Sequence, residues 1–155
     1  MTAYQTYLAG LPQKRMGAGC LFMDTAQRLL IVKPTYRDGW LIPGGVIEAN
    51  ESPRQACIRE VKEELGISCQ PTNLLCVDYV NHNDNYGESL QFVFASSVLD
   101  ISKIVLAERE LSHYQFASIE DALTKLGEST QRRIFWSMEA LKIGETLYLE
   151  NHEPV

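Results

Sequence analysis

The sequence lacks the features that place a protein in a membrane, outside the cell or on duplex nucleic acid. It has no uninterrupted apolar run of the roughly 18 residues that a membrane-spanning helix needs, and no basic start followed by an apolar run at its beginning. Its four cysteines form no CxxC pair, so neither a zinc site nor a disulfide scaffold is expected. A net charge of -6 gives no overall basic field for a phosphate backbone. We therefore expect a cytoplasmic protein with no membrane or duplex nucleic acid partner.

The length and composition are those of one globular domain. The chain has 155 residues, of which 45% are hydrophobic and 22% charged, and this is enough to bury a core. Internal repeats and low-complexity linkers are absent from the sequence. We expect a single domain over residues 1–155.

Short apolar runs separated by turn residues predict strands at 18–23, 29–32, 74–80 and 90–98. The first two of these strands are expected to form one hairpin, and the last two a second hairpin with a long polar tip. Apolar spacing predicts helices at about 119–126 and 129–141, and residues 147–149 close the pattern as a strand. Strands and helices without strict alternation indicate an α+β fold, or an α/β/α sandwich around a mixed β-sheet.

One further helix is specified at both of its ends. Ser52 can cap it, Pro53 suits its first turn, and Gln55 lies where a capping-box partner belongs. Gly66 lies where a left-handed residue ends a helix. The predicted helix therefore runs from about Pro53 to Leu65.

Three glutamates crowd one side of this helix. At about 100° per residue, Glu60, Glu63 and Glu64 lie nearly opposite the apolar side chains that face the core. Like charges three and four residues apart repel each other, and the C-terminal half of a helix disfavours anions. A solvated acidic face is one interpretation, and a site for a hard divalent cation such as Mg²⁺ is the other.

The residues around the glutamates decide between these interpretations. Gly45 is followed after five residues by Glu51, and after seven more by the run REVKEELGI, residues 59–67. This pattern resembles the complete signature box of the Nudix hydrolase family, and WLIPGG at residues 40–45 resembles the family's usual approach to the box. One departure is Asn50, because many members carry glycine at that position.

The resemblance covers about residues 14–126 as the core of the domain, with the C-terminal helix at about 129–141 beyond it. It implies the Nudix α/β/α sandwich and hydrolysis of a diphosphate bond in a nucleoside diphosphate linked to another moiety. The implied cofactor is Mg²⁺ or Mn²⁺, and the implied partner is a small nucleotide-type substrate. Homodimers are common in such families, so the oligomeric state stays open.

The resemblance also assigns roles to individual residues of this chain. Glu60 and Glu64 are the expected direct metal ligands, Glu63 is expected to share the metal or bind it through water, and the backbone carbonyl of Gly44 is a further ligand. Three residues are expected to support the site without reacting: Glu51 and Arg59 as an orienting ion pair, and the turn glycine Gly45.

The general base and the substrate contacts are less well defined. Family members often use a glutamate after the box, which makes Glu110 the first candidate, with Glu108, Glu88 and a box glutamate as alternatives. Stacking on a base or contact with a phosphate would suit several aromatic and histidine side chains, namely Tyr36, Trp40, Tyr79, Tyr86, Phe92, His82 and His113.

Two other functions compete with hydrolysis. A non-catalytic nucleotide-sensing Nudix-like module is the main alternative, but such regulators usually have an eroded box and a further domain. An isoprenoid diphosphate isomerase would need a catalytic cysteine, and Cys57 on the box helix is wrongly placed for that role.

Overall fold

The computed structural model describes residues 1–81, 87–97 and 100–155. In these residues the elements follow the order α1 (Ala3–Ala9), β1 (Arg15–Phe22), β2 (Leu29–Pro34), β3 (Gly44–Val46), α2 (Pro53–Leu65), β4 (Pro71–Val80), β5 (Ser89–Ser96), the 3-10 helix η1 (Ile101–Lys103), β6 (Leu111–Ala117), α3 (Ile119–Lys125), α4 (Glu128–Ile143), β7 (Leu147–Glu150) and β8 (Glu153–Pro154).

The strands form a six-stranded mixed sheet and a separate two-stranded sheet. The large sheet has the order β3-β1-β5-β4-β7-β8, in which β1 is parallel to β5 and β4 is parallel to β7. The small sheet pairs β2 with β6 in antiparallel register. The predicted α+β class with a mixed sheet is confirmed.

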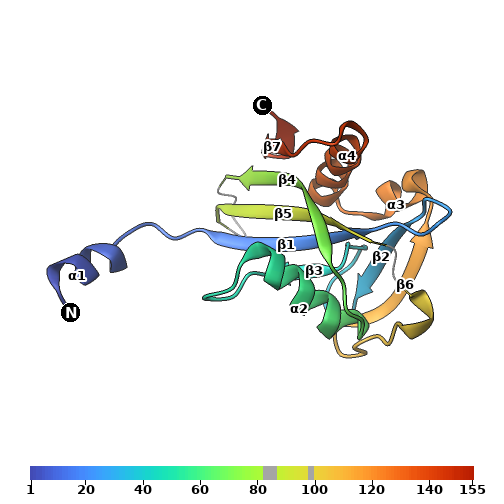
Figure 1. Ribbon diagram of the computed structural model, residues 1–155, viewed down its shortest axis with the longest axis horizontal. Helices are drawn as coiled ribbons and strands as arrows, with labels where there is room; N and C mark the ends of the chain where they lie inside the picture. Colours follow the sequence, from blue (N-terminus) through green and yellow to red (C-terminus); the bar gives the residue numbers. More distant parts are fainter. Residues whose placement is uncertain (82–86, 98–99) are drawn as a thin grey trace.

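Helices cover the sheets from both sides (Figure 1). One core cluster lies beneath α2, and the other contains residues of α3 and α4. Strand β2 contributes to both, because Leu29 and Ile31 belong to the α3–α4 cluster while Leu30 and Val32 belong to the α2 cluster. Side chains alternate along a strand, so four consecutive apolar residues fit a strand that is buried on both faces. This is the predicted α/β/α sandwich.

The first predicted hairpin is wrong and the second is confirmed. Strands β1 and β2 do not pair, and an isolated bridge joins Met23, just after β1, to Leu29, since β3 and β5 already occupy the two edges of β1. Strand β2 instead pairs with β6. Strands β4 and β5 pair as an antiparallel hairpin. Residues 82–86 of its polar tip and residue 98 of its second run lie outside the described residues.

The box helix has the predicted ends. Helix α2 spans Pro53–Leu65, the hydroxyl of Ser52 accepts from the amide of Gln55, and Gly66 ends the helix at a φ of 69°. Helix α4 is slightly longer than predicted and ends at Gly144, with a φ of 72°.

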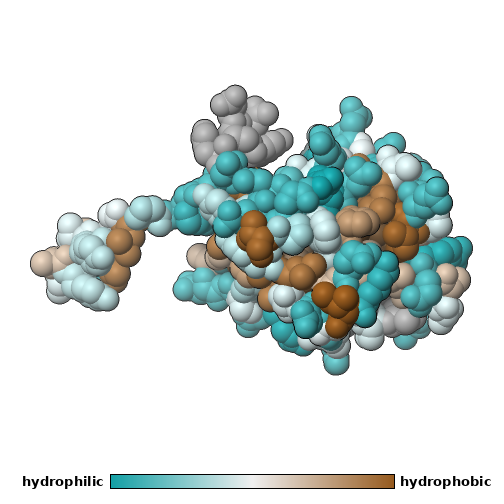
Figure 2. All heavy atoms as spheres, turned by 90° about the horizontal axis from the view of Figure 1, so that it is seen from above, coloured by the Kyte–Doolittle hydropathy of each residue, from teal (hydrophilic) through white to brown (hydrophobic). Residues whose placement is uncertain are grey.

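Helix α1 was not predicted, because its seven residues are all exposed and leave no buried stripe to detect. It stands apart from the rest of the molecule at the end of residues 10–14, and Figure 2 shows apolar side chains on this arm. In the part of the chain that the structure describes, every helix is too short or too polar to cross a membrane.

Candidate active site

Helix α2 does not simply turn its three glutamates to solvent. Glu63 is exposed, Glu60 is half-buried, and Glu64 is only 7% exposed. The amide of Gly44 in β3 donates to Glu64 Oε2 at 3.0 Å. The acidic side of the helix therefore faces the glycine turn at the start of β3, which a helix-wheel argument alone does not reveal.

Two glycines let the backbone approach these carboxylates. A side chain at Gly45 would overlap the carboxylate of Glu60, and a side chain at Gly44 would overlap the carbonyl oxygen of Ala18. Gly44 also has a φ of 146°, which side chains rarely permit. Gly44 therefore requires glycine, whereas a side chain at Gly45 would displace the carboxylate of Glu60 from its present position.

Arg59 uses every one of its donors inside the same site. Its Nε and Nη2 donate to the two oxygens of Glu51 at 2.8 and 3.0 Å, and Nη2 also donates to the carbonyl of Val46 at 2.9 Å. Its Nη1 donates to Glu60 at 2.9 Å and to Glu63 at 3.0 Å. A guanidinium has five N–H groups in a planar fork, and all five are occupied here.

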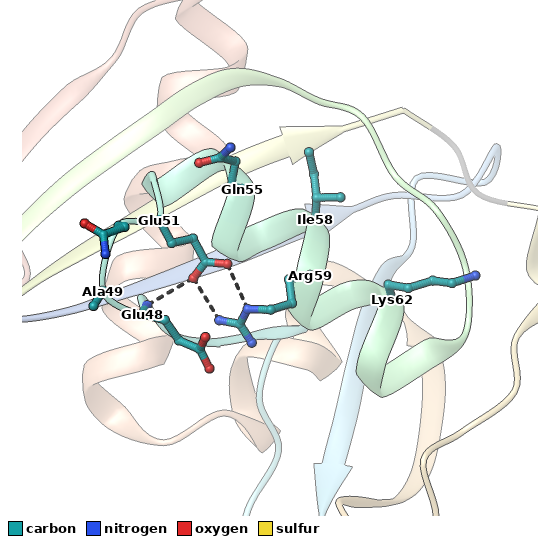
Figure 3. A pocket seen from close by; sticks show the side chains of 8 residues that line it. Glu48, Ala49, Glu51, Gln55, Ile58, Arg59 and Lys62 are labelled. Carbon is teal, nitrogen blue, oxygen red and sulfur yellow. Dashed lines mark hydrogen bonds and ion pairs between the residues drawn. The ribbon is translucent and has the colours of Figure 1, made fainter.

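The ion pair between Glu51 and Arg59 joins the loop after β3 to α2 (Figure 3). Figure 3 shows the two side chains facing each other at the wall of a 560 Å³ surface hollow. The neighbouring Asn50 takes a φ of 62°, in the left-handed region. This explains the departure from glycine, because asparagine tolerates that region better than other residues with side chains.

Burial dominates the electrostatics of the two inner glutamates. It raises the pKa of Glu64 to about 8, against the opposing effect of the hydrogen bond from Gly44 and with a further contribution from the charge of Glu60. Burial also raises the pKa of Glu60, although Arg59 opposes it. The hydrogen bonds of Arg59 instead lower the pKa of Glu51. In the part of the chain that the structure describes, Glu64 is thus a buried acid that forms no ion pair, unlike Glu51, Glu60 and Glu63.

Glu60, Glu64 and the carbonyl of Gly44 offer the oxygen atoms that a hard divalent cation binds, but these atoms do not surround a single point in the structure. Carboxylate oxygens and a backbone carbonyl are the ligands that Mg²⁺ and Mn²⁺ prefer. The glycine cradle at Gly44 and Gly45 leaves space for such ligands beside Glu60 and Glu64. Within residues 1–81, 87–97 and 100–155, however, no three acidic, histidine or cysteine groups converge as a ready metal site. Arg59 holds Glu60 and Glu63 in their present positions.

Of the base candidates outside the box, Glu110 is exposed at the surface. Its charge contributes to the raised pKa of both Glu60 and Glu64. The carboxylate of Glu88 is bound by Lys14 and by the hydroxyl of Tyr79. Glu108 is exposed.

A cleft of about 410 Å³ adjoins the glycine turn. Gly44 and Gly45 form part of its wall, together with Arg15, Arg37 and Arg133. Among the described residues that line it, none is an aspartate or glutamate. In a protein with a net charge of -6, this is a local concentration of positive charge beside the acidic helix.

One wall of the cleft contains a buried network that sequence reasoning missed. Asp78 of β4 is fully buried and accepts from Arg133 Nε at 2.8 Å and from the amide of His152 at 3.0 Å. The Nδ1 of His152 lies 2.7 Å from Asp78 Oδ2. Arg133 and His152 both line the cleft. An aspartate inside the apolar strand LLCVDYV is the signal that could have revealed it.

The aromatic and histidine candidates divide between the cleft and other places. Tyr36 and Phe92 line the cleft. Trp40 packs against the α3–α4 core, the hydroxyl of Tyr79 binds Glu88, and His113 is exposed on β6. His82 and Tyr86 lie outside the described residues.

The fold places the chain in a known structural class. The solved structure of a UDP-X diphosphatase superimposes with a TM-score of 0.77 at 22% identity, covering 96% of this chain and 75% of the other. At this identity the likeness shows that the fold is shared.

Sequence comparison then identifies the family. The NUDIX domain model matches residues 13–136, which is well over half of the chain, so the protein belongs to the Nudix family. An RNA pyrophosphohydrolase of Hydrogenovibrio crunogenus is 34% identical over 61 residues, covering 39% of this chain and 37% of the relative. The human diphosphoinositol polyphosphate phosphohydrolase NUDT4B is 30% identical over 86 residues, covering 54% and 48%. The chain thus spans less than half the length of these two relatives.

Proposed function

We propose that this protein hydrolyses a diphosphate bond in a nucleoside diphosphate linked to another moiety, with the help of a divalent metal ion. The observation that carries the proposal is the meeting of opposite charges at Gly44 and Gly45. On one side of this turn lies the acidic face of α2, where Glu64 forms no ion pair within the described residues, and on the other lies a cleft whose lining includes three arginines. A phosphoanhydride needs cations at its reacting phosphates and a binding surface for the rest of an anionic molecule.

Within this proposal, Glu60, Glu64 and the carbonyl of Gly44 hold the metal, and Glu63 contributes from the exposed edge. Hydrolases of the family generally need a divalent ion, and we propose Mg²⁺ or Mn²⁺ because the ligands are all oxygen. When bound, such an ion neutralises phosphate charge and lowers the pKa of water. Glu51 and Arg59 fix the loop against α2 and thereby position the ligands.

Glu110 is the proposed general base. The support for this proposal is that its charge adds to the raised pKa of both inner glutamates. A carboxylate there can accept the proton of an attacking water. Substitution of Glu110 by glutamine should then lower turnover with little change in KM.

The cleft is the proposed site for the remainder of the substrate. Its volume of about 410 Å³ lies within the usual range for small-molecule sites. Arg15, Arg37 and Arg133 suit a second phosphate or another anionic group, and Tyr36 and Phe92 offer rings for stacking. These features favour a small nucleotide-type substrate.

The direct test is product analysis by chromatography for a panel of anhydrides, with Mg²⁺, with Mn²⁺ and with chelator, because cleavage of an internal diphosphate bond gives two phosphate monoesters and no free phosphate. The panel includes nucleotide sugars, dinucleotides, nucleoside triphosphates, RNA with a 5′-terminal diphosphate or triphosphate, and diphosphoinositol polyphosphates. Metal-dependent cleavage of one class supports the proposal and identifies the substrate. If none is cleaved while nucleotides still raise the melting temperature, the protein is a sensing module instead.

A further inference from the structure

The turn between β7 and β8 carries a histidine at a position where a side chain is unfavourable. Asn151 and His152 form this two-residue turn, and their φ angles are 51° and 72°. A tight hairpin with positive φ at both central residues strongly favours glycine at the second of them. Residues other than glycine cost stability in this backbone region, and such positions concentrate at functional sites. The turn thus keeps the side chain of His152 at a cost in backbone strain.

Asp78 fixes both the position and the tautomer of this ring. Its Oδ1 accepts from the backbone amide of His152 at 3.0 Å, and its Oδ2 lies 2.7 Å from Nδ1. Asp78 is ionised in its pair with Arg133, and an ionised carboxylate only accepts hydrogen bonds. Nδ1 therefore carries a proton and donates it to Asp78. In the neutral ring, Nε2 is then an acceptor.

Nε2 of His152 is accessible to a molecule in the cleft. Among the described residues no hydrogen bond engages this atom, and the side chain of His152 is 16% exposed. Nε2 is not one of the enclosed polar atoms that lack a partner in this part of the chain, so solvent reaches it. His152 lines the same cleft as Tyr36 and Phe92. The ring therefore offers the cleft one acceptor at a fixed position.

Arg133 adds hydrogen-bond donors beside this acceptor but little net charge. Its Nη2 lies 3.5 Å from Nδ1 of His152, and its Nε donates to Asp78 at 2.8 Å in an ion pair. The charges of Arg133 and Asp78 compensate each other. Within residues 1–81, 87–97 and 100–155, no hydrogen bond engages Nη1 of Arg133. An acceptor and a donor without net charge suit a hydroxyl group, which both donates and accepts, better than an anionic phosphate oxygen.

We propose that His152 is a specificity-determining residue whose Nε2 accepts a hydrogen bond from a sugar hydroxyl of the substrate, with Arg133 as a donor to the same hydroxyl. The inference rests on the proposed function for its class of substrate. Tyr36 and Phe92 offer rings for a base in the same cleft, and ribose is the group that joins a base to the diphosphate. The ribose of the nucleoside is therefore the first source of this hydroxyl, and a sugar in the linked moiety is the second.

The experiment measures equilibrium binding by titration calorimetry, with ligands that contain no diphosphate bond and are therefore not turned over. Ribonucleoside 5′-monophosphates are compared with their 2′,3′-dideoxy forms, and ribose 5-phosphate with 2-deoxyribose 5-phosphate, all in Mg²⁺. The wild type should bind the hydroxylated member of a pair about tenfold more tightly, the scale of one lost hydrogen bond. A preference among the nucleotides identifies the ribose of the nucleoside. A preference between the sugar phosphates alone identifies the linked moiety.

The variant His152→Asn tests whether the ring causes this preference. The side-chain amide nitrogen of asparagine lies as many bonds from Cα as Nδ1 does, so it can still donate to Asp78, but no atom replaces Nε2. Asparagine also tolerates a positive φ. The variant should keep its melting temperature and reduce the preference to less than about threefold. The matched control His113→Asn changes an exposed histidine of β6 that does not line the cleft, and it should keep the full preference.

A purely structural role for His152 would change the melting temperature and not the preference. If His152→Asn does not fold, His152→Gly replaces it, because glycine readily adopts a φ of 72° and its amide can still bind Asp78. An unchanged preference in the folded variant, no preference in the wild type, or no binding of any of these ligands overturns the proposal. Hydrolysis without the preference would contradict this inference alone, and the preference without hydrolysis would contradict the proposed function alone.

Discussion

Glu64 and Asp78 are two buried carboxylates whose surroundings act in opposite directions. Glu64 is 7% exposed and Asp78 0%, but burial raises the pKa of Glu64 to about 8, whereas the pKa of Asp78 is lowered. Burial also opposes the charged form of Asp78, and its contacts with His152 and Arg133 outweigh that effect. Glu64 receives one hydrogen bond from Gly44 and has no cation beside it in the described structure.

On the proposed function, this difference separates a structural carboxylate, Asp78, from a metal-binding one, Glu64. Asp78 forms its ion pair within the chain, so the folded protein needs nothing more at that position. Glu64 is costly to bury as an anion until a cation arrives from outside. A buried acid without a partner is therefore the better indicator of a ligand site than a buried acid as such.

The largest expected effect follows from neutralising Glu64. Glu64→Gln should lower kcat/KM by at least about 10²-fold, the scale of losing one electrostatic contact at a reacting centre. Its melting temperature in chelator above pH 8 should be unchanged or higher, because the Glu64 carboxylate that is charged above its pKa of about 8 is no longer buried. Enzyme assays and thermal unfolding test the two parts. Near-normal turnover at saturating Mg²⁺ would exclude Glu64 as a metal ligand.

The reverse result is expected at Asp78. Asp78→Ala should lower the free energy of unfolding by about 3 kcal/mol, because it leaves the largely buried Arg133 without its partner. Urea unfolding measures this loss. Asp121→Ala, which removes a partly exposed pair with Lys125, is the control and should cost less than about 1 kcal/mol. Equal losses in both variants would contradict the distinction.

Metal should stabilise the protein through the surroundings of Glu64 and not through those of Asp78. Saturating Mg²⁺ should raise the melting temperature of the wild type by about 5 °C, since a ligand that binds only the folded state stabilises it. The double variant Glu60→Gln/Glu64→Gln should lose most of this increase, and the Asp78→Ala variant should keep it. The same increase in all three proteins would show that Mg²⁺ acts elsewhere.

Acid should remove the contribution that Asp78 makes to the free energy of unfolding. The pKa of Asp78 is lower in the folded state than its ordinary value of 3.8, so its stabilising contribution is complete above that value and disappears as the pH falls through the folded pKa. Urea unfolding between about pH 5 and pH 3 should therefore give a steeper loss for the wild type than for Asp78→Asn. Parallel curves would contradict the lowered pKa.

The sequence predicted the parts of this comparison that depend on local spacing. Ser52, Gln55 and Gly66 define α2 within fifteen residues, and the box places Glu60 and Glu64 on one helix. The local pattern also identified the pair of glycines before the helix, although not why they are needed.

Long-range contacts are what the sequence did not predict. Asp78 meets Arg133 and His152 across 55 and 74 residues, and nothing local indicates that β7 lies parallel to β4 and brings His152 to that position. The same reason explains the failure of the first hairpin. A short polar turn favours pairing of β1 with β2, but the edges of β1 are occupied by strands that come later in the chain.

Arg59 has a further consequence for how the pocket acquires its metal. Because its guanidinium already binds Glu60 and Glu63, the chain carries a tethered competitor whose effective concentration is fixed by the helix. The acidic face can therefore form during folding without any free ion. On the proposed function, a divalent cation that binds Glu60 and Glu63 has to displace this competitor, so metal occupancy should depend on the free cation concentration over a range that Arg59 helps to set.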